Sequence, residues 1–341
     1  MRLMSLAAET WLKTTPSGLY CEPGGFYIDP LRAVERAVIS HAHADHARPG
    51  HAHVLATEGT LAVMRTRMGA ERAGGVQQAV PYGETITING VKTTLYPAGH
   101  VLGAAQIALD YGGARVIISG DYKRQSDPTC AGFEVQTCDV FVTEATFGLP
   151  VFQHPAAADE IAKLLASVEM FPERTHVVGC YALGKCQRLI GELRKSGYDK
   201  PVYLHGAHVA VCGTYTELGV ELGELRPATV ADKASLKGSI VLAPPSAIAD
   251  RWARRLEDPV VCMASGWMSI RQRAKAGGVE LPLVISDHAD WNDLLTTIRD
   301  VQAPEIWVTH GSEEALIHAA QRMQIRARAL RLIGYGDEDL M

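Results

Sequence analysis

Six consecutive residues, His41-Ala-His43-Ala-Asp45-His46, contain four side chains of the kinds that bind metal ions. Neutral imidazoles and a carboxylate suit a borderline-soft divalent ion such as zinc. Alternate residues of an extended chain project to the same side, so His41 and His43 can bind one ion while Asp45 and His46 turn toward a second. The pattern predicts a metal site. The alternative is a histidine-rich surface loop, because further histidines follow closely.

Two further candidate ligands follow segments that are typical of strands. His100 lies in the glycine-containing segment 97–103, and Asp121 lies in segment 117–122, after an apolar strand. Taken singly, each has an ordinary explanation as a structural histidine or a turn aspartate. Together with the first four they supply six nitrogen and oxygen ligands, enough for two ions if Asp121 bridges them. Ions about 3.5–4 Å apart can hold a hydroxide and brace the oxygens of a phosphoryl displacement.

The composition of the whole chain limits its class. With 341 residues, 47% hydrophobic and 21% charged, it has the make-up of a globular protein of one large or two ordinary domains. No apolar run approaches the roughly 20 residues of a membrane helix, and we expect neither a secretory signal nor a membrane partner. The seven scattered cysteines favour a reducing cytoplasm, and they argue against a disulfide framework or a cysteine-based zinc site.

The predicted elements change character along the chain. The first 150 residues are mainly short strands, with one clear helix over Glu58–Met68. Strands and helices then alternate, with elements predicted over Pro155–Met170, His176–Gly179, Lys185–Lys195 and Val260–Ala264. This alternation indicates a mostly parallel sheet covered on both sides. We therefore predict a discontinuous first domain, 1–150 plus 280–341, interrupted by an inserted α/β domain of residues 151–279.

The HxHxDH pattern, followed by a distant histidine and by an aspartate after a strand, resembles the metallo-β-lactamase superfamily. The resemblance implies an α/β fold, an αββα sandwich with the ligands on loops at one edge. It also implies the ligands of two ions, one bound by His41, His43 and His100, the other by Asp45 and His46, with Asp121 shared.

Three later segments resemble additional motifs of the β-CASP nucleases, in which the inserted domain clamps the substrate. They are Thr143–Gly148 with Glu144, Ser286–Asp290 with His288, and Val308–Gly311 with His310. The resemblance implies that His310 completes the second metal site, that His288 contacts the scissile phosphate and protonates the leaving oxygen, and that Glu144 orients His288. A carboxylate bonded to one ring nitrogen fixes the tautomer and favours the protonated ring. Asp45 is expected among the catalytic residues as well as the ligands.

The resemblance extends over nearly the full length and is strongest to the bacterial ligase-associated DNA exonucleases, on Thr15–Cys21, Ile28–Pro30 and the run ending at Gly50. It implies a hydrolase in DNA repair, acting with an ATP-dependent DNA ligase, in which a metal-bound hydroxide attacks DNA. One residue departs from this pattern. Eukaryotic DNA-processing relatives usually have Val in the third motif and RNA-cleaving relatives have His, as His310 is here. An RNA-processing ribonuclease is therefore the alternative, and an inactive metal-bearing nucleic-acid binding subunit is a third possibility.

Zinc is the expected metal for such imidazole-rich sites, with manganese as the alternative, since it fits a nitrogen and oxygen two-metal site as well. The remaining histidines are expected to be structural or surface residues: His51, His53, His205 and His208.

Candidate substrate-binding residues fall in the inserted domain. Segment 179–186 nearly matches a phosphate-binding P-loop, but Cys186 stands where Ser or Thr is needed to hold magnesium. The segment resembles the β-CASP turn-helix motif instead, which implies that Lys185 and Gln187 face the substrate; a solvated Lys185 is the alternative. Further along, a strand-binding surface is predicted, with phosphates on cations and a base on an indole. Its residues are Trp267, Arg271 and Arg273, against the alternative of an ordinary exposed helix.

Overall fold

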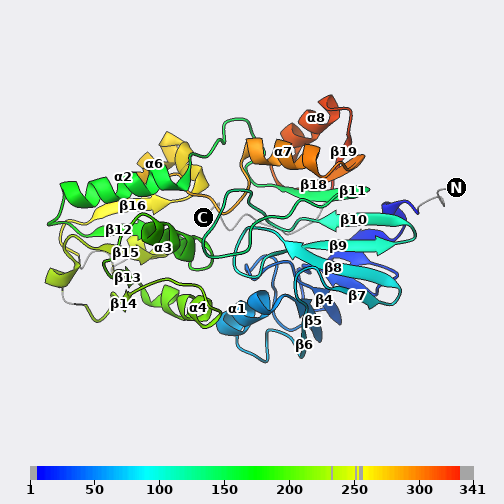
Figure 1. Ribbon diagram of the computed structural model, residues 1–341, viewed down its shortest axis with the longest axis horizontal. Helices are drawn as coiled ribbons and strands as arrows, with labels where there is room; N and C mark the ends of the chain where they lie inside the picture. The colour runs from blue at the N-terminus through cyan, green and yellow to red at the C-terminus, as the bar shows by residue number, and fades with distance from the viewer. Residues whose placement is uncertain (1–5, 232, 250–251, 253–255, 331–341) are drawn as a thin grey trace. The chain divides into compact units, whose positions relative to one another are not determined.

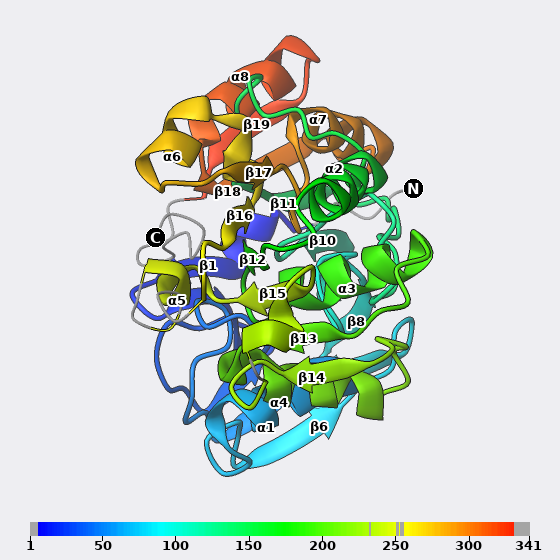
Figure 2. The same ribbon diagram turned by 90° about the vertical axis from the view of Figure 1, so that its left-hand side faces the viewer.

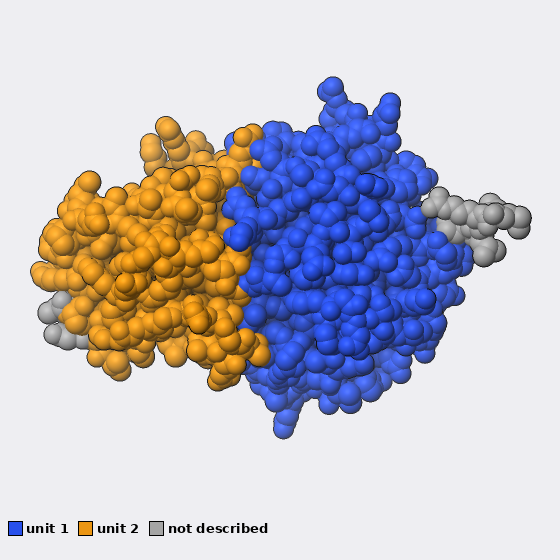
Figure 3. Space-filling view, viewed as in Figure 1, with its two compact units in different colours: residues 1–126, 130–151, 288–341 blue, residues 127–129, 152–287 orange. Residues whose placement is uncertain are grey.

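The computed structural model describes residues 6–231, 233–249, 252 and 256–330, which form two compact units (Figure 3). The described residues within 1–126, 130–151 and 288–341 form unit 1, and those within 127–129 and 152–287 form unit 2. The sequence assigned residues 280–287 to the first domain. They group with unit 2 instead, because strand β17 (Leu281–Leu283) pairs in parallel with strand β16 (Val260–Ala264).

Unit 1 is built on two sheets. The first has six strands in chain order: β1 (Leu12–Thr15), β2 (Gly18–Cys21), β3 (Phe26–Ile28), β4 (Arg36–Val38), β5 (His53–Ala56) and β6 (Val76–Ala79). The second has the order β19-β18-β11-β10-β9-β8-β7, with bounds β7 (Thr85–Ile88), β8 (Val91–Pro97), β9 (Ala105–Tyr111), β10 (Ala114–Ile118), β11 (Val140–Ala145), β18 (Glu305–Gly311) and β19 (Arg326–Ala329). Strands β8, β10, β11 and β18 point the same way, so their carboxyl ends share one edge.

The core of unit 1 lies between these sheets. Side chains alternate along each strand, so Val116 and Ile118 of β10 join the core cluster while Ile117 does not. Residues from both sheets are at most 2% exposed: Leu19, Ile28, Val38, Ile107, Val116 and Val142. Burying each of these side chains contributes roughly 1.5–3 kcal/mol, which holds the sheets face to face.

Helices cover the outer faces of the two sheets. In Figure 1, α7 (Trp291–Asp300) and α8 (Glu313–Arg322) lie along β18 and β11, while α1 (Glu58–Met68) lies beside β4–β6. The layers of unit 1 are therefore helix, sheet, sheet and helix. None of the helices among the described residues is both long and apolar enough to cross a membrane.

Helix α7 begins where Asp290 caps it. The Asp290 Oδ1 accepts a hydrogen bond from the Asp293 backbone N–H at 2.9 Å. Burial raises the pKa of the Asp293 carboxyl to about 6; the Asp290 carboxylate adds to this shift and Arg124 opposes it. The Asp293 carboxylate in turn acts on Tyr122. Burial raises the pKa of the Tyr122 hydroxyl, and the negative charge of Asp293 adds to that shift.

Unit 2 contains one parallel sheet, ordered β14-β13-β15-β12-β16-β17. The bounds of its other strands are β12 (His176–Gly179), β13 (Val202–Leu204), β14 (Leu225–Pro227) and β15 (Ile240–Ala243). These short apolar runs are buried on both faces, which is typical of parallel sheets. Helices flank the sheet in Figure 2: α2 (Ala157–Met170), α3 (Lys185–Lys195), α4 (Gly206–Glu217), α5 (Pro245–Ala249) and α6 (Arg271–Ala276).

Helix α4 was not predicted from the sequence. It contains two glycines and several β-branched residues, which are weak helix formers, and its apolar residues form no clear stripe. The helix starts at Gly206 because the His205 ring caps it, with Nδ1 accepting from the Ala207 backbone N–H at 3.2 Å. Packing against β13, β15 and α3 stabilises it despite its composition.

Candidate metal centre

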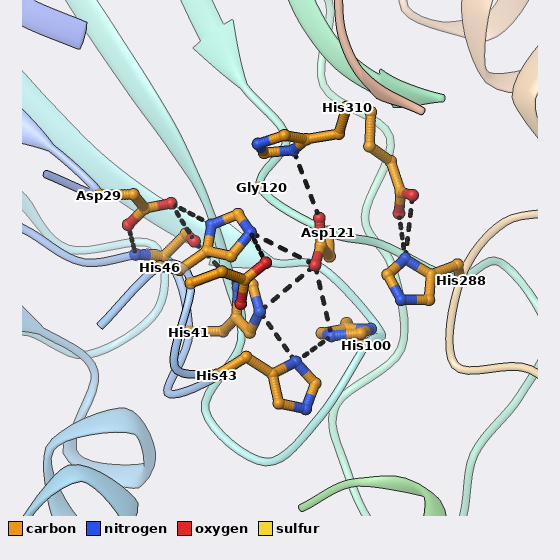
Figure 4. A network of polar contacts seen from close by, with 12 residues as sticks. Asp29, His41, His43, His46, His100, Gly120, Asp121, His288 and His310 are labelled. Atoms are coloured by element: carbon orange, nitrogen blue, oxygen red, sulfur yellow. Dashed lines mark hydrogen bonds and ion pairs between the residues drawn. The ribbon is translucent and has the colours of Figure 1, made fainter. Parts of the chain in front are cut away.

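The predicted metal ligands lie at one edge of the unit 1 sandwich. The segment with His41 and His46 follows β4, His100 follows β8, and Asp121 follows β10, while His310 lies near the end of β18. Because the carboxyl ends of β8, β10 and β18 share an edge, residues up to 210 positions apart converge there (Figure 4). His41 and His46 are 0% and 1% exposed, which rules out the surface-loop interpretation.

Asp121 is the centre of this group. Its Oδ2 lies 3.4 Å from Nε2 of His41, 3.4 Å from Nε2 of His46 and 3.8 Å from Nε2 of His100. Its Oδ1 lies 3.9 Å from Nδ1 of His310. One carboxylate therefore faces four imidazoles, three of them through Oδ2 and His310 through Oδ1.

The other two predicted ligands, His43 and Asp45, lie beside these histidines. Nδ1 of His43 lies 3.0 Å from Nε2 of His41 and 2.9 Å from Nε2 of His100. Oδ2 of Asp45 lies 3.5 Å from Nε2 of His46. The predicted ligands form three overlapping groups whose ligand atoms are within 4.8 Å of one another: His41, His43, His100 and Asp121; His41, Asp45 and His46; His46, Asp121 and His310. A fourth group joins Asp121 to Glu144 and His288.

This donor set fits divalent metal ions. All ligand atoms are imidazole nitrogens or carboxylate oxygens, which suit zinc and manganese. The buried Oδ1 of Asp45 has no hydrogen-bond partner among the described residues. A buried carboxylate oxygen normally has a partner, and a bound cation would provide one.

Outer residues orient two of the histidines. Nδ1 of His46 lies 2.8 Å from Oδ2 of Asp29, and Nδ1 of His41 lies 3.0 Å from Oγ of Ser40. Asp29 also accepts a hydrogen bond from the Ser40 backbone N–H at 2.7 Å. These contacts leave Nε2 of both rings turned toward Asp121, as partners of metal-binding histidines commonly do. This role of Asp29 was not predicted from the sequence, although its position directly after β3 is a signal for such a residue.

Burial and charge set the protonation of the centre. Burial lowers the pKa of His41 well below its usual value, and lowers that of His310 to about 4. Burial also acts to lower the pKa of His46, but the carboxylates of Asp121 and Asp45 outweigh it and raise that pKa well above its usual value. The Asp121 carboxyl is held ionised against its own burial, chiefly by His46. Neutral His41 and His310 rings beside an ionised carboxylate are the forms that bind metal.

Two glycines allow the ligand loops to approach one another. Gly99 precedes His100 with φ +75°, and a Cβ there would lie 2.3 Å from the Lys123 carbonyl oxygen. Gly120 precedes Asp121 with φ +54°, and a Cβ there would lie 2.8 Å from the Ser40 side chain. Any larger residue would push the two ligands away from their places.

Beside the metal ligands, His288 pairs with Glu144. Nδ1 of His288 lies 2.9 Å and 3.1 Å from the two carboxylate oxygens of Glu144 (Figure 4). Glu144 is 1% exposed and also accepts from the Tyr122 backbone N–H at 2.8 Å. The rings of His288 and His100 are 4.8 Å apart, so the pair adjoins the ligands. Its geometry fixes the Nδ1 side of His288 and turns its other nitrogen away from Glu144.

The predicted substrate-binding residues all belong to unit 2. Gln187 does not fit that role, because its amide is used inside the unit. Its Oε1 accepts from the Gly184 N–H at 2.8 Å, and its Nε2 donates to the Ala182 carbonyl at 2.9 Å. Lys185 is 1% exposed, which excludes the solvated alternative; its Nζ lies 3.8 Å from Asp287.

The second predicted surface has a different character. Trp267 is half-buried, and the Arg273 guanidinium lies 4.2 Å from the centre of its ring. Arg271 and Arg273 are exposed. These residues have the charge and the aromatic face that nucleic-acid strands bind.

Several known proteins are similar to this chain in sequence. Residues 282–329 match the family model described as a Zn-dependent metallo-hydrolase RNA specificity domain. A protein named Probable DNA ligase from Opitutus terrae is 29% identical over 302 residues, covering 86% of this chain and 28% of that protein. Endoribonuclease YSH1 of Eremothecium gossypii is 29% identical over 47% of this chain and 26% of its own length. Cleavage and polyadenylation specificity factor subunit 3-I of Arabidopsis thaliana is 23% identical over 72% and 43%, respectively.

These matches support the predicted resemblance to the β-CASP family of the metallo-β-lactamase superfamily. The predicted fold class, an αββα sandwich with an inserted α/β domain, is confirmed. A solved structure of a protein of unknown function from Enterococcus faecalis V583 shares the fold, with a TM-score of 0.59 at 11% identity over 88% of this chain and 80% of that one. The chain spans little more than a quarter of the length of these first two relatives, 28% and 26%.

Proposed function

We propose that this chain is a two-metal phosphodiesterase that cleaves nucleic acid, acting as a DNA exonuclease in DNA repair. One observation supports the proposal most strongly: the Asp121 carboxylate lies between four histidines that are predicted to belong to two metal sites. Its oxygens are 3.4–3.9 Å from ring nitrogens of His41, His46, His100 and His310. A carboxylate in this position could bind two metal ions at once. Two ions held close together can stabilise the attacking and leaving oxygens of an in-line phosphoryl displacement.

The residues of the chain have distinct parts in this reaction. When bound, the two ions supply an activated water and stabilise charge on the phosphate oxygens. His288 donates a proton to the leaving oxygen, since its Nδ1 is occupied by Glu144 and its other nitrogen points away from that residue. Glu144 is a positioning residue, held in turn by the Tyr122 N–H. Asp45 faces His46 and acts in the second set of ligands.

DNA is the proposed substrate because a relative that matches 86% of the chain carries the name Probable DNA ligase. Association with an ATP-dependent DNA ligase is part of the same proposal. The alternative substrate is RNA, which is favoured by His310, by the description of the matching family model and by the ribonuclease names of other relatives.

Zinc is the proposed metal, with manganese as its alternative. The cytoplasm is the proposed location because all seven cysteines are free thiols.

Unit 2 is the proposed substrate-clamping domain. Exposed Arg271 and Arg273 would bind phosphates, and Trp267 would stack on a base. Lys185 remains a candidate for a phosphate contact, with Asp287 as its partner in the substrate-free protein.

The test digests end-labelled single-stranded DNA and RNA of the same sequence, with zinc, manganese and magnesium in parallel. We expect the wild-type protein to shorten DNA from one end, and Asp121→Ala to be inactive while keeping the wild-type circular dichroism spectrum. Asp199→Ala changes an exposed aspartate of unit 2 and should cleave at the wild-type rate. Faster cleavage of RNA would select the ribonuclease. Full activity of Asp121→Ala, or no cleavage of either strand with any metal, would refute the phosphodiesterase.

A further inference from the structure

A second group of metal-binding side chains lies inside unit 2. The ligand atoms of Cys180, Cys186 and His208 are all within 4.8 Å of one another, and all three residues are 0% exposed. A third thiol adjoins Cys186 alone: Sγ of Cys212 lies 3.8 Å from Sγ of Cys186 but outside the group whose ligand atoms are all within 4.8 Å. Three sulfurs and one imidazole are the ligand types of structural zinc sites.

Three separate elements bring these residues together. Cys180 directly follows β12, and Cys186 is the second residue of α3. His208 and Cys212 are four residues apart on α4, so both project from the same face of that helix. The spacing along the chain is unlike a CxxC motif, which is why the sequence argued against a cysteine-based zinc site.

The distance between the two sulfurs fits a tetrahedral ion. With zinc–sulfur bonds of about 2.3 Å and tetrahedral angles, two sulfurs on one ion lie about 3.8 Å apart. Cys186 and Cys212 are separated by 3.8 Å. Cys186 links Cys212 to the other ligands. It belongs to the group with Cys180 and His208, and its sulfur contacts that of Cys212.

His208 is the second, independent observation. Neither ring nitrogen makes a hydrogen bond of normal geometry with the described residues, although the ring is fully buried. Burial lowers the pKa of His208 to about 4, and the nearby carbonyls of Cys180 and Leu242 oppose this only in part. Burying a polar ring whose nitrogens make no hydrogen bond of normal geometry costs free energy. A neutral imidazole is also the form that binds metal.

A neighbouring amide completes the surroundings. Nε2 of Gln187 donates a hydrogen bond to Sγ of Cys212 at 3.2 Å. Such a bond favours the thiolate over the thiol, and amide donors of this kind orient metal ligands from outside. This contact also accounts for the Gln187 side chain being directed into the unit.

We propose that Cys180, Cys186, His208 and Cys212 bind a structural zinc ion within unit 2. The site is separate from the candidate metal centre, since every ligand belongs to unit 2 and three of the four are sulfur. Binding converts three thiols to thiolates and releases their three protons to solvent. The ion joins the end of β12, the start of α3 and the middle of α4, and so fixes the turn that leads to Lys185.

Cobalt substitution tests this site separately from the phosphodiesterase. Thiolate–cobalt bonds give an intense near-ultraviolet charge-transfer band, whereas the histidine and aspartate ligands of unit 1 cannot. Wild-type protein, refolded with cobalt under reducing conditions, should show this band. Asp121→Ala should keep it, together with one bound cobalt, even though the centre in unit 1 is damaged.

Substitutions then assign the ligands. Cys186→Ser removes one of three thiolates and should lower the band by roughly one third or more. Cys262→Ser changes a buried cysteine of β16 outside the group and should leave the band unchanged. Absence of the band from the wild-type protein would overturn the proposal, and so would an unchanged band in Cys186→Ser. If Cys186→Ser does not fold, the Asp121→Ala protein decides: a thiolate band with one cobalt supports the site, and its absence refutes it.

Discussion

The pair formed by Glu144 and His288 gives the sharpest prediction about the proposed reaction. Two donors converge on the buried Glu144 carboxylate: the Tyr122 N–H at 2.8 Å and Nδ1 of His288 at 2.9 Å. Glu144→Gln keeps the size of the side chain but leaves a single acceptor oxygen. The amide can accept from Tyr122 or from His288, and its NH₂ group then faces the other donor.

The magnitude follows from this conflict. A buried donor without an acceptor costs about 1–3 kcal/mol, and we expect the free energy of unfolding to fall by that amount. Loss of an orienting partner typically lowers activity about 10–100-fold, which corresponds to about 1.4–2.7 kcal/mol of transition-state stabilisation. Removing the acid itself, in His288→Ala, should lower the rate about 10²–10⁴-fold.

Single-turnover cleavage of end-labelled DNA by the two single variants and the double variant measures this coupling. Because Glu144 acts through His288, the double variant should cleave no more slowly than His288→Ala alone. Metal content should stay at the wild-type level in all three proteins, since neither residue is a proposed ligand. The reasoning is wrong if Glu144→Gln cleaves at the wild-type rate, or if the losses of the two single variants multiply in the double variant.

Three further predictions concern residues around the centre. Asp29→Asn should weaken metal binding in unit 1 about 10–100-fold in a chelator competition; unchanged affinity would remove Asp29 from the orienting role. Gly99→Ala should lower the free energy of unfolding by at least about 1–3 kcal/mol in urea titrations, from its positive φ alone, whereas Gly132→Ala, with no atom within 4 Å of the added Cβ, should be near neutral. Because burial raises the pKa of Asp293 from 3.8 to about 6, the folded protein favours the protonated carboxyl group. The stability that this group contributes is therefore fully present below pH 3.8 and is lost as the pH rises through about 6. Asp293→Asn should therefore be more stable than wild type at pH 8 by about 1 kcal/mol, after allowing for solvent screening at this half-buried site, and equally stable at pH 3.5; equal stability at both pH values would contradict the shift.

Much of the candidate metal centre could be predicted from the sequence, because its ligands lie in local patterns. His41, His43, Asp45 and His46 are adjacent in the chain, and Asp121 follows an apolar strand directly. The bounds of α1 and α3 were also predicted. The apolar residues of α3 recur with helical periodicity, whereas those of α1 do not, and α1 begins where the Thr57 side chain caps it. The boundary at residues 280–287 was not, because pairing of β17 with β16 depends on a strand some 20 residues earlier.

Other features required the folded chain. The register shift between β11 and β18 near Thr143 and Ala145 determines where the end of β18 lies, and with it His310, whose φ of +57° no sequence pattern predicts. The partners of Gln187 are backbone groups and a distant thiol, so its apparent availability to substrate disappeared in the structure.

The sequence by itself indicated the candidate ligands of unit 1, the family resemblance and the pairing of Glu144 with His288, because each rests on short motifs whose chemistry is local. Only the tertiary structure revealed the group of Cys180, Cys186, His208 and Cys212. Two of these ligands lie on α4, a helix with weak intrinsic propensity that forms because it packs on the sheet. Long-range packing, rather than local preference, places those ligands together, and packing of that kind leaves no periodic trace in a single sequence.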